Sequence, residues 1–124
     1  MPKVYNSCNA FCLISRGEGF GLPYIEAAST CLPIIASNVT AQTDYLNNDN
    51  SFLVEPDGYI ESTLSGNLSG MAKLCHFYEG QVFPDFSRTG VEQTRKHMRF
   101  VYENYKEAKT KAEKLRNLVI NNYT

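Results

Sequence analysis

A glycine-rich turn between a short apolar run and a helical pattern constrains the fold of this chain more than any other feature. The turn lies in the segment Ser15-Arg16-Gly17-Glu18-Gly19-Phe20-Gly21-Leu22-Pro23. The apolar run at 10–15 predicts a buried strand, and residues 22–30 predict a helix, because Pro23 suits a first helical turn and apolar residues follow at helical spacing. At such a junction the unpaired amides and the positive end of the helix dipole favour a bound anion. We expect Gly19 and Gly21 to let this ligand approach the backbone, where a Cβ would collide with it.

Two further apolar runs predict a parallel sheet. They are Pro33-Ile34-Ile35-Ala36-Ser37 and Ser51-Phe52-Leu53-Val54, and a strong turn follows the second at residues 55–58. Strands that are joined through a helix by short links pair in parallel, and apolar runs without alternation indicate a sheet covered on both faces. The predicted fold class is therefore α/β.

Charge divides the chain into parts. Residues 1–87 hold three basic and nine acidic side chains, whereas residues 88–124 hold nine basic and four acidic ones. The second part is predicted to be helical, with a capping box at Thr89–Glu92 and apolar residues recurring at a helical period. We expect an α/β core at 1–58, an irregular connection at 59–87, in which only Met71–Tyr78 has a helical pattern, and a helical region at 88–124.

Composition excludes several classes of protein. A chain of 124 residues with 43% hydrophobic content predicts one globular domain, and no apolar run is long enough to cross a bilayer or to form a signal peptide. We therefore expect a cytoplasmic protein. The net charge of −1 gives no reason to bind nucleic acid. The basic helical surface could touch acidic lipids or nucleic acid, but the pattern favours a solvated helix face.

The cysteines and histidines give no sign of a metal site. The four cysteines show no C-x-x-C spacing and lie in apolar surroundings, so we expect reduced, buried thiols. The two histidines have no partners at ligand or triad spacing, which favours surface or packing roles. No metal and no cofactor is expected.

Two carboxylates beside the glycine turn indicate which anion fits. The dinucleotide motif G-x-G-x-x-G fails because Leu22 stands at its third glycine position, and the P-loop motif G-K-[ST] is absent. Glu18 and Glu26 instead flank the turn, and carboxylate oxygens suit hydroxyl donors on either side of a diphosphate. Glu26 lies one helical turn, about 5.4 Å, beyond Leu22, which is roughly the step from a pyrophosphate to a ribose diol. A nucleotide sugar has such hydroxyls on both sides of its diphosphate, so we assign its sugar to Glu18, its phosphates to the backbone of Gly19–Leu22, and its ribose to Glu26.

The segment Glu18-Gly19-Phe20-Gly21-Leu22-Pro23-x-x-Glu26-Ala27 resembles the E-x7-E signature of the retaining, group 1 (family 4) glycosyltransferases of the GT-B fold. The strand at 33–37, the turn at 38–46, the strand at 50–54 and the later helices also resemble this family. The resemblance implies a partial Rossmann-like parallel sheet from the C-terminal, donor-binding domain, followed by C-terminal helices.

The resemblance also implies an activity and its site residues. It implies transfer of a hexosyl group from a UDP- or GDP-sugar with retention of configuration. Glu18 would be the catalytic residue, the donor sugar and diphosphate would contact Gly19, Phe20, Gly21 and Leu22, and Glu26 would bind the ribose. The acceptor-binding N-terminal domain of such enzymes has no counterpart in these residues, so we expect the isolated chain to be inactive. The alternative is a non-catalytic remnant or a docking subunit.

Two positions depart from the family pattern. Family members usually have glycine where this chain has Cys31, at the end of the motif helix. A non-glycine residue in a left-handed C-cap would cost on the order of 1 kcal/mol, unless the helix ends in a different way. They also favour a glycine pair where Thr40-Ala41 stands. We therefore expect the loop that follows the second strand either to bind its ligand differently from that of its relatives or not to bind it at all.

Overall fold

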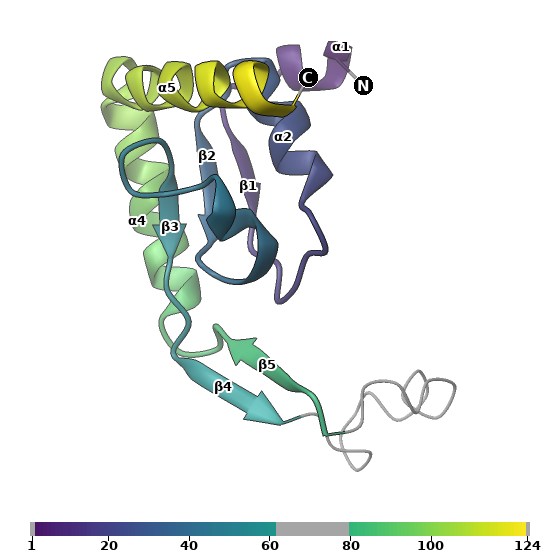
Figure 1. The fold of residues 1–124 in the computed structure, drawn as a ribbon. Coiled ribbons are helices and arrows are strands. Elements are labelled where there is room, and N and C mark those ends of the chain that lie inside the picture. The colour runs from purple at the N-terminus through teal and green to yellow at the C-terminus, as the bar shows by residue number, and fades with distance from the viewer. Residues whose placement is uncertain (1, 62–79, 124) are drawn as a thin grey trace.

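The computed structural model describes residues 2–61 and 80–123 and has a mixed α/β fold. Its main sheet is parallel and has the strand order β1-β2-β3, formed by Phe11–Leu13, Ile34–Ser37 and Phe52–Val54. Cys12 lies opposite Ile35 in the register, and Ile35 lies opposite Phe52. The predicted parallel α/β core followed by C-terminal helices is confirmed (Figure 1).

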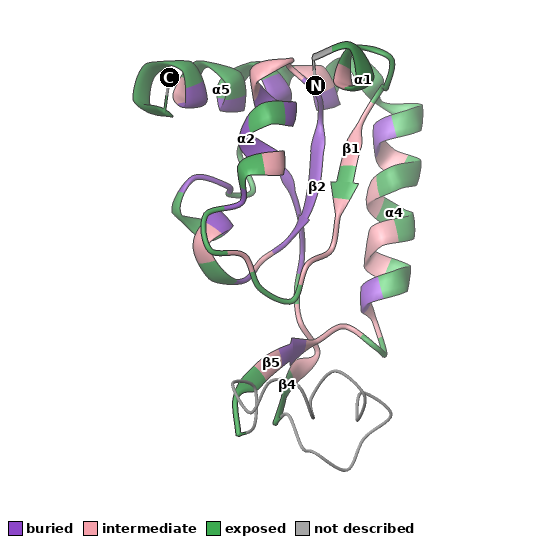
Figure 2. Ribbon diagram, turned by 90° about the vertical axis from the view of Figure 1, so that its right-hand side faces the viewer, coloured by how far each residue is buried: buried purple, intermediate pink, exposed green. Residues whose placement is uncertain are grey.

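Helices cover both faces of the sheet. Helices α2 (Leu22–Ser29) and α5 (Tyr105–Tyr123) pack on one face, and α4 (Gly90–Glu103) packs on the other. Figure 2 shows the sheet between α2 and α4, and Figure 1 shows α5 running across the end of the molecule at which both termini lie. A short helix α1 (Pro2–Asn6) precedes β1, and a 3₁₀-helix, η1 (Thr40–Asp44), follows β2.

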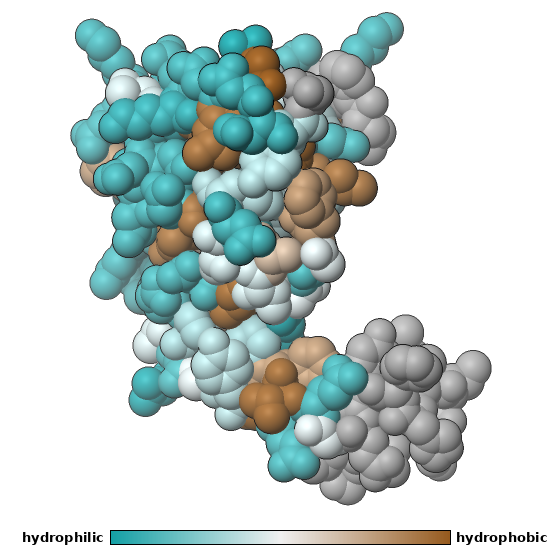
Figure 3. Space-filling view, in the orientation of Figure 1, coloured by the Kyte–Doolittle hydropathy of each residue, from teal (hydrophilic) through white to brown (hydrophobic). Residues whose placement is uncertain are grey.

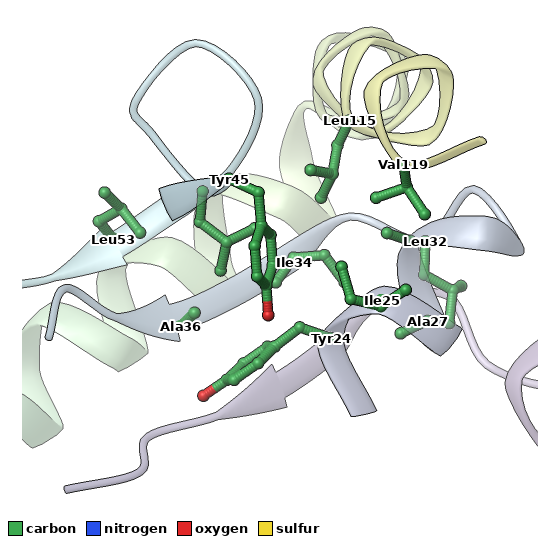
Figure 4. Packing of buried hydrophobic residues seen from close by; sticks show 12 residues of the cluster. Tyr24, Ile25, Ala27, Leu32, Ile34, Ala36, Tyr45, Leu53, Leu115 and Val119 are labelled. Carbon is green, nitrogen blue, oxygen red and sulfur yellow. The ribbon is translucent and has the colours of Figure 1, made fainter. Parts of the chain in front are cut away.

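The two core clusters explain why the strands carry apolar runs without alternation. Neighbouring residues of β2 point to opposite faces, so Ile34 and Ala36 pack toward α2 and α5, while Ile35 packs toward α4. Figure 4 shows Leu115 and Val119 of α5 above the first of these clusters. Both faces of the central strand are therefore buried, as the sequence pattern predicts.

The predicted irregular connection at 59–87 is wrong at its two ends. Gly58–Glu61 forms strand β4 and Val82–Asp85 forms strand β5, and these strands pair in an antiparallel ribbon that projects from the body (Figure 1). The ribbon exposes the apolar side chains of Tyr59, Ile60 and Val82, and Figure 3 shows part of this apolar surface. The helical prediction for Met71–Tyr78 lies outside the described residues.

The expectation of buried thiols is wrong for two of the four cysteines. Cys8 and Cys12 are exposed and Cys31 is half-buried, while Cys75 lies outside the described residues. Cys12 belongs to β1, which is an edge strand, and it lines an open hollow between this strand and α4 together with Ile35, Met98 and Tyr102. The exposure of Cys12 therefore follows from the free edge of the sheet.

The predicted capping box at the start of α4 does not form. The hydroxyl of Thr89 makes no capping bond and instead donates to the carboxylate of Asp57, which also accepts the amides of Arg88 at 2.8 Å and Thr89 at 3.0 Å. The side chain of Asp57 is only 7% exposed. The buried carboxylate of Asp57 thus accepts the Thr89 amide that Glu92 would accept in a capping box.

These bonds predict how stability depends on pH. The hydroxyl of Thr89, followed by its amide, lowers the pKa of Asp57. A carboxylate whose pKa is lower in the folded chain adds stability above the ordinary carboxyl pKa of about 4, and this contribution is lost as the pH falls through the folded value. We expect Asp57→Asn to lower the Tm at pH 7 and to have much less effect near pH 2. Thermal melts by circular dichroism measure both, with Asp49→Asn at an exposed turn as the control; equal Tm losses at both pH values would contradict this role.

Helix α2 ends in a left-handed residue, as the position of Cys31 suggested. Cys31 has φ 63°, its amide donates to the carbonyl of Ala28 at 2.9 Å, and the amide of Leu32 donates to the carbonyl of Ala27 at 3.3 Å. This is the Schellman pattern, in which glycine is the favoured left-handed residue. Lys109 and Arg116 of α5 bind the carbonyls of Cys31 and Ser29 and so complete the helix end.

Glycine at this helix end should stabilise the chain. We expect Cys31→Gly to raise the free energy of unfolding by about 1 kcal/mol, because glycine adopts positive φ without the steric cost of a Cβ. Urea unfolding followed by circular dichroism provides the measurement. The matched control is Cys31→Ala, which removes the sulfur but keeps the Cβ and so should give no such gain. If alanine stabilises the chain as much as glycine, the backbone explanation is wrong.

Candidate functional site

The glycine turn lies at the carboxyl edge of the parallel sheet. It begins after β1 and ends at Gly21, which precedes the first residue of α2. The loop that follows β2 lies beside it, because the amide of Glu18 donates to the hydroxyl of Thr40 at 3.1 Å. Crevices outside the carboxyl ends of parallel strands are the usual ligand sites of open α/β sheets. The fold thus places the predicted turn where such a site would be.

The hydroxyl of Tyr45 fixes the direction of the turn. It lies 2.9 Å from the carbonyl oxygen of Phe20 and 3.0 Å from that of Gly21, so its single hydrogen is shared between these two acceptors. In a trans peptide the amide hydrogen points away from the preceding carbonyl, so the amides of Gly21 and Leu22 point away from Tyr45. Tyr45 is buried, and its ring contacts those of Phe20 and Tyr123.

Four successive amides of the turn lack partners within the described residues. The amides of Tyr24 and Ile25 bond the carbonyl of Gly21, and no hydrogen bond of the described chain uses the amides of residues 19–22. Leu22 is 60% exposed and Phe20 is 45% exposed, so the leading end of α2 borders open space at these two residues, while Gly21 between them is buried. The turn therefore presents donors to a ligand at the positive end of a helix.

The two glycines of the turn serve different purposes. A Cβ on Gly19 would meet nothing within 4 Å, so this residue borders open space. Gly21 has φ 81°, and a Cβ there would lie 2.5 Å from the hydroxyl oxygen of Tyr45. The expectation that both glycines make room for a ligand is therefore wrong for Gly21, because the chain itself fills that space.

Glu18 stands at the start of the open amides. Its side chain is half-buried, and its negative charge lies near two buried tyrosine hydroxyls. Burial, with a smaller contribution from Glu18, raises the pKa of Tyr24 to about 12. Burial, with smaller contributions from Tyr24 and then Glu18, also raises the pKa of Tyr45. Both tyrosines therefore remain neutral hydrogen-bond donors at physiological pH, and Tyr24 donates to the carbonyl of Leu13 at 2.9 Å.

Glu26 lies in the second turn of α2 and is exposed. Because Leu22 and Glu26 are four residues apart on one helix, they share a face, as predicted. The hydroxyl of Tyr5 in α1 donates to a carboxylate oxygen of Glu26 at 3.0 Å. Sequence reasoning missed Tyr5, since its partner lies 21 residues further along the chain.

A second group of residues that sequence reasoning missed lies behind the turn. It consists of polar side chains at the end of β2 and in η1, namely Ser37, Thr40 and Gln42. Ser37 and Gln42 are fully buried and hydrogen-bonded. The polar Ser37 at the carboxyl end of an otherwise apolar strand is the signal that could have shown this group.

An apolar groove runs along the free edge of the sheet, outside the glycine turn. Its volume is about 690 Å³, and Ile14, Phe86, Val91, Met98 and Tyr102 contribute to its lining. Tyr102 is 80% exposed and Val91 is 66% exposed, so the apolar face of α4 continues beyond the part that covers the sheet. Thr94, Arg95 and Arg99 are the other side chains that line it.

The turn offers backbone amides as hydrogen-bond donors, between the carboxylates of Glu18 and Glu26 as acceptors. Amides at a helix start bind a phosphate or diphosphate, and carboxylates on either side accept hydrogen bonds from hydroxyl groups.

Among the helices that the structure describes, none is both long and apolar enough to cross a membrane.

Comparisons with known proteins identify the family of this chain. Residues 1–64 match the family model described as glycosyl transferases group 1. The chain is 35% identical over 57 residues to the O-antigen chain mannosyltransferase B of Escherichia coli, a match covering 46% of this chain and 15% of that protein. It is 39% identical over 54 residues to the capsular polysaccharide biosynthesis glycosyltransferase CapM of Staphylococcus aureus, covering 43% of this chain and 14% of that protein.

A structural comparison gives a distant neighbour. The chain resembles a protein in the crystal structure of a GtfA/B complex with 21% identity and a TM-score of 0.39, over 95% of this chain and 22% of that one. The matches thus span only a small part of the length of these curated proteins and of the solved chain. The segment matched by the family model includes β1, α2, β2 and β3, and with them the glycine turn and both carboxylates.

Proposed function

This chain belongs to the group 1 family of glycosyltransferases, and on that premise we propose that it forms part of the donor site of a cytoplasmic, retaining enzyme with the GT-B fold. The donor is a nucleotide sugar of the UDP or GDP class, and the group transferred is a hexose. An acceptor-binding domain on the other side of a cleft would complete the enzyme.

The site residues have separate roles in this proposal. Glu18 accepts hydrogen bonds from hydroxyls of the donor sugar and is the catalytic residue. The backbone of Gly19, Phe20, Gly21 and Leu22 binds the sugar and the diphosphate, and Glu26 accepts hydrogen bonds from the ribose diol. The open amides and the exposed start of α2 are the observation that supports these roles most directly.

The chemistry that these groups supply is electrostatic. When the bond between the anomeric carbon and the diphosphate oxygen breaks, negative charge grows on the leaving diphosphate. Amides that already point at this charge stabilise it without reorganising, and the helix dipole adds to their effect. The carbonyl contacts of Tyr45 hold the amides of Gly21 and Leu22 in that direction before the donor arrives.

Calorimetry with the purified chain tests the proposal. The ligands are UDP, GDP, their hexose derivatives, and inorganic pyrophosphate as a probe of the amides alone. We expect binding at millimolar or lower concentration, tighter for a nucleoside diphosphate than for pyrophosphate. Glu18→Gln should remove the advantage of a UDP-hexose over UDP and leave UDP binding unchanged, while Asp49→Asn should change neither. Absence of binding by every ligand at millimolar concentration would overturn the donor-site proposal.

The apolar groove favours a second candidate, a subunit that docks on another chain. A large exposed apolar surface on one side of a sheet edge is unusual for an isolated globular protein. If docking is its main role, Met98→Asp should abolish self-association or partner capture in sedimentation experiments. The same substitution should leave nucleoside diphosphate binding unchanged if the chain is a donor site. A chain that binds no nucleotide yet associates through this groove would support the docking alternative.

A further inference from the structure

Thr40 has a backbone conformation that threonine rarely adopts. Its φ is 54°, in the left-handed region, and a β-branched residue there is a conformational outlier. Such residues persist only where their surroundings hold them in place, and they cluster at functional sites. Thr40 lies at the start of η1, directly beside the glycine turn.

A ring of hydrogen bonds holds Thr40 in this conformation. The amide of Glu18 donates to the Thr40 hydroxyl at 3.1 Å, and this hydroxyl donates to the Gln42 side-chain oxygen at 3.0 Å. The amide nitrogen of the Gln42 side chain donates to the Ser37 hydroxyl at 3.1 Å, and this hydroxyl donates to the carbonyl of Ser15 at 2.6 Å. The backbone from Ser15 to Glu18 closes the ring.

All hydrogen bonds of this ring run in the same donor-to-acceptor direction. Each hydroxyl accepts one hydrogen bond and donates another, so the bonds run from the Glu18 amide to the Ser15 carbonyl without a break. Ser37 and Gln42 are fully buried, where water does not compete and hydrogen bonds in series strengthen one another. The ring therefore fixes both ends of the segment 15–18, immediately before the four open amides.

We propose that Thr40 is a positioning residue for the donor site, acting through the amide of Glu18. This inference rests on the proposed function. By holding that amide, the Thr40 hydroxyl sets the direction in which the Glu18 side chain leaves the backbone and the path of the chain into Gly19. It also occupies the Glu18 amide, so the ligand is left with the amides of residues 19–22.

The conformation of Thr40 supports a role for its hydroxyl. Glycine would adopt φ 54° without steric cost, but it could not accept a hydrogen bond from Glu18 or donate one to Gln42. Serine keeps the hydroxyl and loses only the branching methyl group. Valine keeps the branched shape, and with it the strain, but loses the hydroxyl. These three substitutions therefore separate strain from hydrogen bonding.

The test measures amide hydrogen exchange by NMR and nucleoside diphosphate affinity by calorimetry in the 124-residue chain. Thr40→Val and Thr40→Gly should each speed exchange at the Glu18 amide at least tenfold and weaken binding of UDP-hexose or GDP-hexose about fivefold to tenfold. Thr40→Ser should keep both values within twofold of wild type. The control is Thr94→Val, which removes a hydroxyl bonded within α4 and should lower Tm without changing either value.

The outcomes distinguish this inference from the proposed function. If wild type binds none of the ligands, the donor-site proposal fails, while the exchange data still show whether Thr40 fixes the turn. If wild type binds and Thr40→Gly binds as tightly with unchanged exchange, the positioning role of Thr40 is wrong and the donor site stands. Should strain prevent Thr40→Val from folding, Thr40→Gly decides the question, because glycine suits this backbone.

Discussion

Replacing Gly21 by alanine is expected to lower the free energy of unfolding by about 3 kcal/mol. Two costs add. The residue has φ 81°, which is unfavourable for alanine, and the new Cβ would lie 2.5 Å from the hydroxyl oxygen of Tyr45 and 2.8 Å from the ring of Tyr24. Both tyrosines are buried in the core and have little freedom to move away. Urea unfolding followed by circular dichroism measures the loss.

Gly19→Ala is the matched control for this prediction. Gly19 has no positive φ, and a Cβ there would meet nothing within 4 Å. We expect the free energy of unfolding to change by no more than about 0.5 kcal/mol, as at most surface sites. The effect of Gly19→Ala should instead appear in ligand binding, because the added methyl group projects into the open space of the turn. Equal losses of stability at both positions would mean that the tyrosine contacts do not explain Gly21.

The contrast between these glycines shows what the sequence could and could not predict about the site. The pattern of strand, glycine turn and helix was enough to place the turn at the carboxyl edge of a parallel sheet, because this arrangement depends on local residues. The reason for Gly21 was not local. It depends on Tyr45, which lies 24 residues further along the chain and reaches the turn only in the folded protein.

The same distinction applies to the fold. The strand at 34–37 was predicted within one residue, because its apolar run is bounded by turn residues on both sides. Strands β4 and β5 were missed, because β5 contains Pro84 and neither strand shows a clear alternation of apolar and polar residues. Each is stabilised by the other across a gap of twenty residues, and periodicity within one segment does not detect such pairing.

The capping of α4 shows how a local motif can be overridden. Thr89 and Glu92 have the spacing of a capping box, yet the folded chain brings the carboxylate of Asp57 to the same amides. The approach of Asp57 follows from the pairing of β4 with β5, because its amide bonds the carbonyl of Asp85 at 2.7 Å. The local sequence was enough to predict where this helix begins, but the group that accepts its first hydrogen bonds, Asp57, depends on the tertiary structure.

The largest effect on ligand binding is expected at Glu26. If its carboxylate accepts hydrogen bonds from the ribose, Glu26→Gln should weaken UDP or GDP binding about tenfold or more, because a hydrogen bond to a charged group contributes about 1.5–3 kcal/mol. Calorimetry with the nucleoside diphosphate and with its 2′-deoxy form shows whether the ribose is the partner. Wild type should prefer the ribose form about tenfold, and Glu26→Gln should bind both forms with similar affinity.

Two further variants make this result specific. Tyr5→Phe keeps the carboxylate but removes the hydroxyl that bonds it at 3.0 Å, so its ribose preference should fall between those of wild type and Glu26→Gln. Glu113→Gln changes an exposed carboxylate on α5 and should leave the preference intact. Glu26→Gln and the 2′-deoxy ligand form a double-mutant cycle. The two losses of binding free energy are additive when the Glu26 carboxylate and the ribose 2′-hydroxyl do not touch. A ribose preference that survives Glu26→Gln would therefore remove Glu26 from the nucleotide site, even if the open amides of the turn still bind the diphosphate.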